Sequence, residues 1–337
     1  MNMQSVLVLN PPAPQPVFRD HYCSSEAKST DLWQPLDLQI QALWLRSHGL
    51  TVTAIDAIAE NLSYEAVVQR IRTIAPTHVL MLTSIRSWRQ DRRMCEALRE
   101  MGVKRIVASG DFLRFKTGPF QEAKQYFDWI LTDFVADGVA KSIRADQPIE
   151  PGICDFDADI ETLARELRKT PLDYPVEELP VFGFKRYRLP YPGFHTAASV
   201  LTSFGCTYHC KFCHVGELGY KLRAPEHIVR DFEAAARNGA TCVYVRDALI
   251  NGKLPSDRQC LCRPGLVASR VPARASCLVA EIVRTKAREN KGYGHPSGEA
   301  TASSSAHAAA ASAVSASAKP FLIAWRSAAP ARPCRKA

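Results

Sequence analysis

Three cysteines within eight residues are the part of this sequence best suited to chemistry. Cys206, Cys210 and Cys213 lie in the run GCTYHCKFC, which begins at Gly205. Their spacing, C-x3-C-x2-C, lets one short loop surround one small metal centre. Cysteine thiolates hold iron–sulfur clusters, and a cubane with three protein ligands keeps one iron open for a cofactor or substrate. Gly205 allows a tight turn before the first ligand, and Phe212 would shield the cluster from water.

Two other interpretations of these cysteines stay open. Structural zinc usually takes four ligands, often in two pairs separated by a dozen or more residues. His209 and His214 are the candidates for a fourth zinc ligand, but each is adjacent in sequence to a cysteine, which hinders both from reaching one tetrahedral ion. The third interpretation is a coincidental group of buried thiols.

The elements that must position this loop follow an alternating pattern. A strand is predicted at Ser199–Phe204 before the loop, with a helix at Glu226–Asn238 and a strand at Thr241–Val245 after it. The first 145 residues alternate apolar β-branched runs with helical periodicity, which predicts five β/α units. The strands expected there are Ser5–Asn10, Val52–Ile58, His78–Leu82, Arg105–Ala108 and Trp129–Leu131, and the helices are Leu36–Ser47, Tyr64–Ile74, Arg89–Glu100, Pro119–Tyr126 and Gly138–Ala145.

Five such units form an open, doubly wound, flavodoxin-like α/β sheet, whose ligands bind at the carboxyl ends of the strands. The candidate ligand-binding residues at these ends are Thr83, Ser84, Gly110, Asp111 and Thr132. The alternative is that small polar residues are simply what such loops contain.

The composition divides the chain into four parts. Residues 1–147 form the α/β domain, 148–195 a linker rich in proline and aromatic residues with one helix near Ile160–Lys169, and 196–255 the region of the cysteine loop. Residues 256–337 hold 20 Ala and 11 Ser, with no clear period before a short apolar run at Phe321–Trp325. Such sequence buries too little apolar surface to offset its ordering entropy, so we expect a disordered tail.

The distribution of charge argues against a nucleic-acid-binding protein. The formal net charge is +9, but residues 256–337 carry 13 of the 43 basic and 4 of the 34 acidic residues, which leaves 30 of each sign in 1–255. A nucleic-acid binder would concentrate its basic residues on a structured face. No apolar run is long enough to span a bilayer and no signal segment is evident, so we predict a cytoplasmic protein without a transmembrane segment. Eleven cysteines then indicate thiols or metal ligands rather than disulfides.

The loop GCTYHCKFC resembles the signature of radical S-adenosylmethionine (SAM) enzymes, which also have an aromatic residue before the third cysteine. The doubly wound domain before it resembles the cobalamin-binding domain of the cobalamin-dependent members of that family. The resemblance covers about residues 1–255 and implies the start of a radical SAM partial (β/α) barrel. It implies a [4Fe-4S] cluster on the three cysteines, SAM on the open iron, and cobalamin at the sheet edge formed by Thr83, Ser84, Gly110, Asp111 and Thr132. The SAM-binding candidates are Phe212, Arg246, Asp247 and Asn251.

The function that this resemblance implies is methyl transfer, or carbon–carbon bond or ring chemistry, on an unactivated carbon of a small-molecule or lipid-like substrate. A flavodoxin or ferredoxin would supply the electron. No D-x-H-x-x-G motif is present, so the best-known histidine ligand of cobalt is missing. The barrel pattern stops near residue 255, and we explain this by translation of the remainder in a shifted frame. A non-catalytic cobalamin- or metal-binding module and a zinc-stabilised interaction protein are the alternatives.

Overall fold

The elements of the fold are known for most of the first 248 residues. The computed structural model describes residues 4–19, 24–26, 31–114, 118–149, 152–158, 172–175, 181–188, 196–248 except 209, 212, 214 and 217–219, and 322–324. The helix expected near Ile160–Lys169 and nearly all of the tail lie outside these residues. None of the helices in the described parts of the chain has the length and apolar character needed to cross a membrane.

The N-terminal domain contains one mixed sheet and its covering helices. Its elements are β1 Ser5–Asn10, β2 Val17–Phe18, β3 Ser25–Glu26, α1 Leu36–Ser47, β4 Thr51–Asp56, α2 Tyr64–Ile74, β5 His78–Leu82, α3 Trp88–Glu100, β6 Arg105–Ser109, the 3-10 helix η1 Asp111–Arg114, α4 Gly118–Ala123, β7 Trp129–Leu131, α5 Gly138–Ala145 and β8 Ile153–Cys154.

The sheet has the strand order predicted for a flavodoxin-like domain. It runs β4-β1-β5-β6-β7-β8, with every pair parallel except the last, in which β8 lies antiparallel to β7. Counting only the parallel strands, this order is 2-1-3-4-5, in which the carboxyl ends of all five strands open at one edge. The small antiparallel pair β2–β3 and strand β8 were not predicted, because two residues are too short to show a period.

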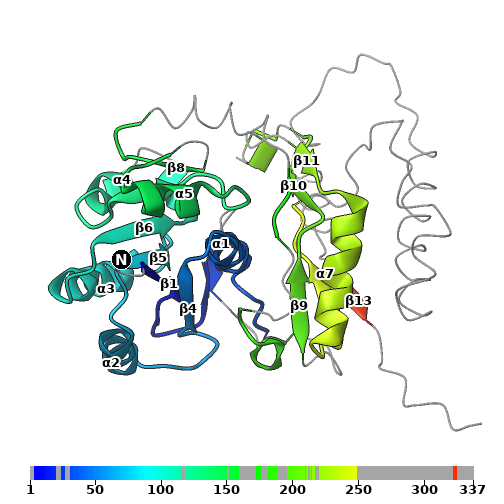
Figure 1. The fold of residues 1–337 in the computed structure, drawn as a ribbon, viewed down its shortest axis with the longest axis horizontal. Coiled ribbons are helices and arrows are strands. Elements are labelled where there is room, and N and C mark those ends of the chain that lie inside the picture. The colour runs from blue at the N-terminus through cyan, green and yellow to red at the C-terminus, as the bar shows by residue number, and fades with distance from the viewer. Residues whose placement is uncertain are drawn as a thin grey trace, which may run out of the picture.

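Both faces of the sheet are covered by apolar side chains, which explains the nearly continuous hydrophobic runs of its strands. Along β1, Val6 and Val8 belong to the core that α1 and α5 cover, whereas Leu7 and Leu9 belong to the core on the opposite face, under α2, α3 and α4. Figure 1 shows the sheet enclosed in this way, with α1 lying between it and the second part of the chain.

The second part contains the beginning of a parallel sheet and a separate hairpin. Its elements are the 3-10 helix η2 Phe184–Arg186, β9 Ala197–Val200, β10 Ser203–Gly205, β11 Tyr220–Leu222, α7 Pro225–Arg237, β12 Cys242–Val245 and β13 Leu322–Ala324. Strands β9 and β12 pair in parallel and are joined through α7, which packs on them through Ile228 and Phe232. This is one β/α unit of the kind predicted, and β13 lies antiparallel on the other edge of β12.

One predicted strand is wrong in form. The single strand expected at Ser199–Phe204 is two strands, β9 and β10, which belong to different sheets. The extended segment is interrupted at Leu201 and Thr202, after which β10 forms an antiparallel hairpin with β11. An apolar run shows that a segment is extended, but it does not show which partner each half will find. Smaller differences concern ends: β4 stops at Asp56, and α4 covers Gly118–Ala123.

The two parts share one hydrophobic core. The core under α1 and α5 continues through Tyr187 and Leu201 to Phe204 of β10, and the half-buried Cys206 and Cys213 pack against it. The hairpin is therefore not a free appendage, because its strand β10 is buried against the N-terminal domain.

Candidate functional site

The cysteine loop starts where β10 ends. Gly205, the last residue of β10, has φ of +79°, a left-handed conformation that a residue with a side chain adopts only at a cost. The backbone N–H of Tyr208 donates to Sγ of Cys206 at 3.4 Å, and the N–H of Cys213 donates to the carbonyl oxygen of Cys210 at 2.9 Å. The glycine predicted to turn the chain before the first cysteine therefore does so.

The three cysteines differ in exposure. Cys206 and Cys213 are half-buried against the shared core, whereas Cys210 is exposed, and all three are free thiols. Within the described ranges, no three side chains of histidine, cysteine, aspartate or glutamate are grouped as metal ligands, so coordination by these cysteines stays a prediction. Phe212, His209 and His214 lie outside the described residues.

Asp247 follows β12 and ties it to the start of the cysteine hairpin. Its Oδ1 accepts the backbone N–H of Thr202 at 2.8 Å, and its Oδ2 accepts the hydroxyls of Thr202 and of Ser203, the latter at 2.9 Å. Burial raises the pKa of Asp247, and these hydrogen bonds oppose that change. Asp247 was predicted to contact SAM, and its carboxylate holds the junction between β9 and β10 in this structure.

Arg246, the neighbouring SAM candidate, lies against aromatic rings. Its guanidinium carbon is 4.8 Å from the centroid of Trp33 and 5.4 Å from that of Tyr244. Burial lowers the pKa of Arg246 to about 9. Asn251, the third candidate after β12, lies outside the described residues.

At the carboxyl ends of the parallel strands, Thr83 and Ser84 are buried and bonded within the protein. The hydroxyl of Thr83 donates to Oδ2 of Asp91 at 2.9 Å, and the backbone N–H of Ser84 points to the same oxygen at 3.3 Å. The hydroxyl of Ser84 is 2.7 Å from that of Ser87. The polar groups of Thr83 and Ser84 are therefore used in hydrogen bonds within the protein at the carboxyl ends of the strands.

The other three candidates at this edge also have partners in the chain. Asp111 accepts the backbone N–H and the hydroxyl of Ser24 through Oδ2, at 3.0 and 2.7 Å. The backbone N–H of Thr132 donates to the carbonyl of Gly152 at 2.9 Å, and Gly110 lies directly against the backbone of Thr83. All five predicted residues thus lie along one edge, as the strand order requires.

Sequence reasoning missed a buried polar network behind this edge. Arg19 donates to Oδ1 of Asp91 and to Oδ1 of Asn10, both at 2.8 Å, and Asn10 donates to Asp56 at 2.8 Å. The hydroxyl of Tyr187 donates to the second oxygen of Asp56 at 2.8 Å, which joins the network to the second part of the chain. Burial raises the pKa of Asp56 and of Asp91. No motif indicated this network, because Arg19 lies 72 residues from Asp91.

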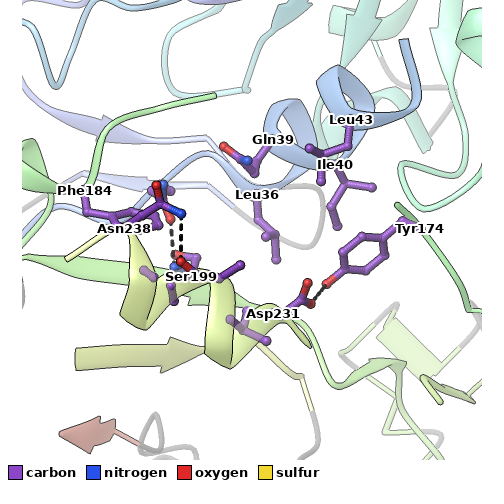
Figure 2. A pocket seen from close by; sticks show the side chains of 14 residues that line it. Leu36, Gln39, Ile40, Leu43, Tyr174, Phe184, Ser199, Asp231 and Asn238 are labelled. Atoms are coloured by element: carbon purple, nitrogen blue, oxygen red, sulfur yellow. Dashed lines mark hydrogen bonds between the residues drawn. The ribbon is translucent and has the colours of Figure 1, made fainter. Parts of the chain in front are cut away.

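A small cavity lies at the junction of the two parts, between α1 and the β9–α7 unit. It encloses about 60 Å³ and is bordered by Leu36, Gln39 and Ile40 of α1, with Tyr174 donating to Asp231 at 3.1 Å on the far side (Figure 2). None of the three cysteines lines it. Ligand sites usually measure about 300 Å³ or more, so this cavity suits a few water molecules rather than SAM or a corrin.

Comparison with known proteins supports the fold. No protein-family model and no curated protein matches the chain. The solved structure of the radical SAM methyltransferase TsrM from Kitasatospora setae, with tryptophan substrate and the SAM analogue aza-SAM bound, has a TM-score of 0.53 and 16% identity, covering 73% of this chain and 48% of that one. The cobalamin-dependent SAM radical enzyme OxsB, with aqua-cobalamin and SAM bound, has a TM-score of 0.48 and 15% identity, covering 75% of this chain and 35% of that one.

The structural neighbours are cobalamin-dependent radical SAM enzymes. At this level of identity the likeness to TsrM is one of fold, and the chain spans about half the length of TsrM. A parallel α/β sheet followed by the start of a second β/α sheet is the architecture that the sequence predicts.

In number and type, the thiols of the cysteine loop suit a cubane cluster, although the described side chains are not grouped as metal ligands. Cys206, Cys210 and Cys213 are three free thiols in one loop, and three thiolates leave one iron of a cubane open. Among the described residues, this end of the sheet carries Ile85, which is 47% exposed although it follows a buried strand, and the partly exposed carboxylate of Asp111.

The structural role of Gly110 at the carboxyl ends of the strands can be tested without any cofactor. A Cβ at this position would stand 2.4 Å from the carbonyl oxygen of Thr83, which is backbone and cannot move aside cheaply. We expect Gly110→Ala to lower the free energy of unfolding by about 2 kcal/mol, measured by urea denaturation without cofactors. Gly118→Ala is the matched control, because no atom of the described residues lies within 4 Å of its Cβ position. Equal stability of the two variants would show that the backbone of Gly110 does not lie as close to that of Thr83 as described.

Proposed function

We propose that this chain is a radical SAM protein in which Cys206, Cys210 and Cys213 hold a [4Fe-4S] cluster and the N-terminal domain binds cobalamin. The observation that carries the proposal is the position of the three free thiols: they follow a strand that is buried in the same core as the doubly wound sheet. When bound, the cluster supplies one electron for cleavage of SAM, and cobalamin supplies methyl-transfer chemistry.

The residues of the chain have distinct tasks under this proposal. Cys206 and Cys213 would hold the cluster, and both pack against the core that contains Phe204, which would keep water away from it. Cys210 is exposed, so the reductant, a flavodoxin or ferredoxin, approaches from that side. Asp247 keeps the start of the hairpin attached to the end of β12, which holds the loop at the carboxyl end of the parallel sheet.

The substrate class follows from the chemistry rather than from a described pocket. We propose methyl transfer, or carbon–carbon bond or ring formation, on an unactivated carbon of a small-molecule or lipid-like substrate. TsrM, the neighbour with the higher TM-score of the two, is described with tryptophan as its substrate, which supports a small molecule. The neutral balance of residues 1–255 also favours such a substrate over nucleic acid.

One observation favours a second function, a non-catalytic cobalamin- or metal-binding module. The described residues contain only two parallel strands of the second sheet, β9 and β12, and the next position on the edge of β12 is taken by the antiparallel β13. An active radical SAM site would need further β/α units around the cluster, and the described chain shows one.

The test is electron paramagnetic resonance of the anaerobically reconstituted, dithionite-reduced protein, with and without SAM, together with detection of 5′-deoxyadenosine. A cubane signal that changes when SAM is added supports the open iron, and deoxyadenosine supports the enzyme. A cubane without any response to SAM favours the non-catalytic module. Zinc in place of iron and sulfide in folded protein would refute the proposal.

A further inference from the structure

A buried ion pair joins the cysteine hairpin to the N-terminal sheet. Nζ of Lys221, on β11, lies 3.1 Å from Oδ2 of Asp133, which follows β7, and the two side chains are only 4% and 1% exposed. The partners are 88 residues apart in the sequence and belong to different parts of the chain. Neither residue was singled out by the sequence, because a lone lysine and a lone aspartate are ordinary surface residues.

On its own side, Asp133 is held rigidly. Its Oδ1 accepts the backbone N–H of Val135 at 3.0 Å, and its own N–H points to the carbonyl of Gly152 at 3.3 Å. Gln41 of α1 donates to the next carbonyl, that of Phe134, at 2.7 Å. Asp133 therefore presents its second oxygen from a fixed loop, directly after Thr132 at the carboxyl edge of the sheet.

On the other side, Lys221 contacts β10, the strand that leads to the first cysteine. It is paired in register with Phe204 of β10, and its Nζ lies 5.4 Å from the centroid of that ring. The ring of Phe204 meets that of Phe134 edge to face, with centroids 5.4 Å apart. Two residues after Phe204 comes Cys206.

A buried ion pair constrains the relative position of two elements more strictly than apolar packing does. Burying two charges carries a large desolvation cost, and an apolar pair of similar volume often stabilises a fold as well or better. An apolar contact, however, tolerates sliding, whereas a buried lysine has one place in which its charge is compensated. Such pairs therefore serve best to define one relative position of two elements.

We propose that Lys221 and Asp133 are positioning residues that fix the cysteine loop relative to the carboxyl edge of β7. The inference rests on the proposed function, because that edge is where cobalamin is proposed to bind and the loop is where the cluster is proposed to bind. The pair then sets the separation between the two cofactors. The paired positions are Asp133 beside Thr132 on one side and Lys221 opposite Phe204 on the other.

The experiment uses a double variant, because a single one leaves a buried charge and risks unfolding. Lys221→Met with Asp133→Asn removes both charges, and the Asn Oδ1 still accepts the N–H of Val135. The matched control is Lys104→Met with Asp146→Asn, an exposed pair at 3.0 Å within the N-terminal domain. Asn is also tolerated at the left-handed φ of +56° that Asp146 adopts.

The first measurement is hydrogen exchange of the cofactor-free chain. In the double variant, we expect protection to fall about tenfold in residues 203–205 and 220–222 on one side of the pair, and also in 132–136 on the other side. The control should show no such fall. Unchanged exchange in these segments would overturn the proposal whether or not any cofactor binds.

The second measurement is the magnetic coupling between the reduced cluster and cob(II)alamin in the reconstituted protein. The double variant is compared with the unaltered chain after its thermal midpoint has been shown to be the same. We then expect a weaker and more widely distributed coupling between cluster and cob(II)alamin, which a merely structural role would not produce. An unchanged coupling would overturn the positioning role. If the unaltered chain takes up neither cofactor, the proposed function fails and the cofactor-positioning claim fails with it. Hydrogen exchange still decides whether the pair holds the cysteine hairpin against the N-terminal domain.

Discussion

Alanine at Cys206, Cys210 or Cys213 is expected to reduce bound iron and acid-labile sulfide from about four of each per chain to nearly none. A cubane with three protein ligands has no ligand in reserve, so losing one thiolate leaves two irons without a protein ligand. The loss should therefore be similar at the exposed Cys210 and at the half-buried Cys206 and Cys213. Iron and sulfide are measured after anaerobic reconstitution, beside the electron paramagnetic resonance signal.

The matched control is Cys95→Ala. Cys95 is a free thiol on the buried face of α3, and burial raises its pKa well above the ordinary value, so it is a poor thiolate. This variant should lose some stability through the small cavity it leaves, and it should keep the full iron and sulfide content. Equal loss of iron from Cys95→Ala would mean that iron binding follows overall folding rather than the loop.

The parallel sheet could be predicted from the sequence because its signals are local. The bounds of β1, β5 and β7 and of α1, α2 and α5 agree with the prediction residue for residue. Strands covered on both faces are continuous apolar runs, and amphipathic helices between them have a clear period, so each element is recognisable without its neighbours. Strand order then follows from the rules of the doubly wound fold.

The hairpin could not be predicted, since its signal is not local. Nothing in the sequence of residues 199–204 marks the break at Leu201 and Thr202, and Asp247, 45 residues later, holds the break by accepting from Thr202. Strand β11 is three residues long, which is too short for a period, and it carries a lysine whose partner lies in another part of the chain. Buried charges resemble surface charges in a sequence, so Lys221 and Asp133 were not recognised, whereas the cysteines were.

Arg19, outside the cysteine loop, is expected to be sensitive to substitution because it belongs to a second buried ion pair. Its guanidinium and the carboxylate of Asp91 are both fully buried, 2.8 Å apart, and Arg19 also donates to Asn10. We expect Arg19→Met to lower the free energy of unfolding by about 3–5 kcal/mol at neutral pH, because it leaves an uncompensated carboxylate in the core. Chemical denaturation measures the loss, and Arg70→Met, whose pair with Glu60 is partly exposed, should lose less than about 1 kcal/mol.

The pH dependence of this loss identifies its cause. Burial already raises the pKa of Asp91 above its ordinary 3.8, and removing the charge of Arg19, which opposes that change, raises it further. A carboxyl whose pKa is raised in the folded state contributes most stability when protonated, and that contribution disappears as the pH rises through the folded-state pKa. The deficit of Arg19→Met should therefore be smallest below about pH 4 and grow toward neutral pH. A deficit that is constant over this range would instead assign the loss to packing and to the hydrogen bond with Asn10, with no contribution from the charge of Asp91.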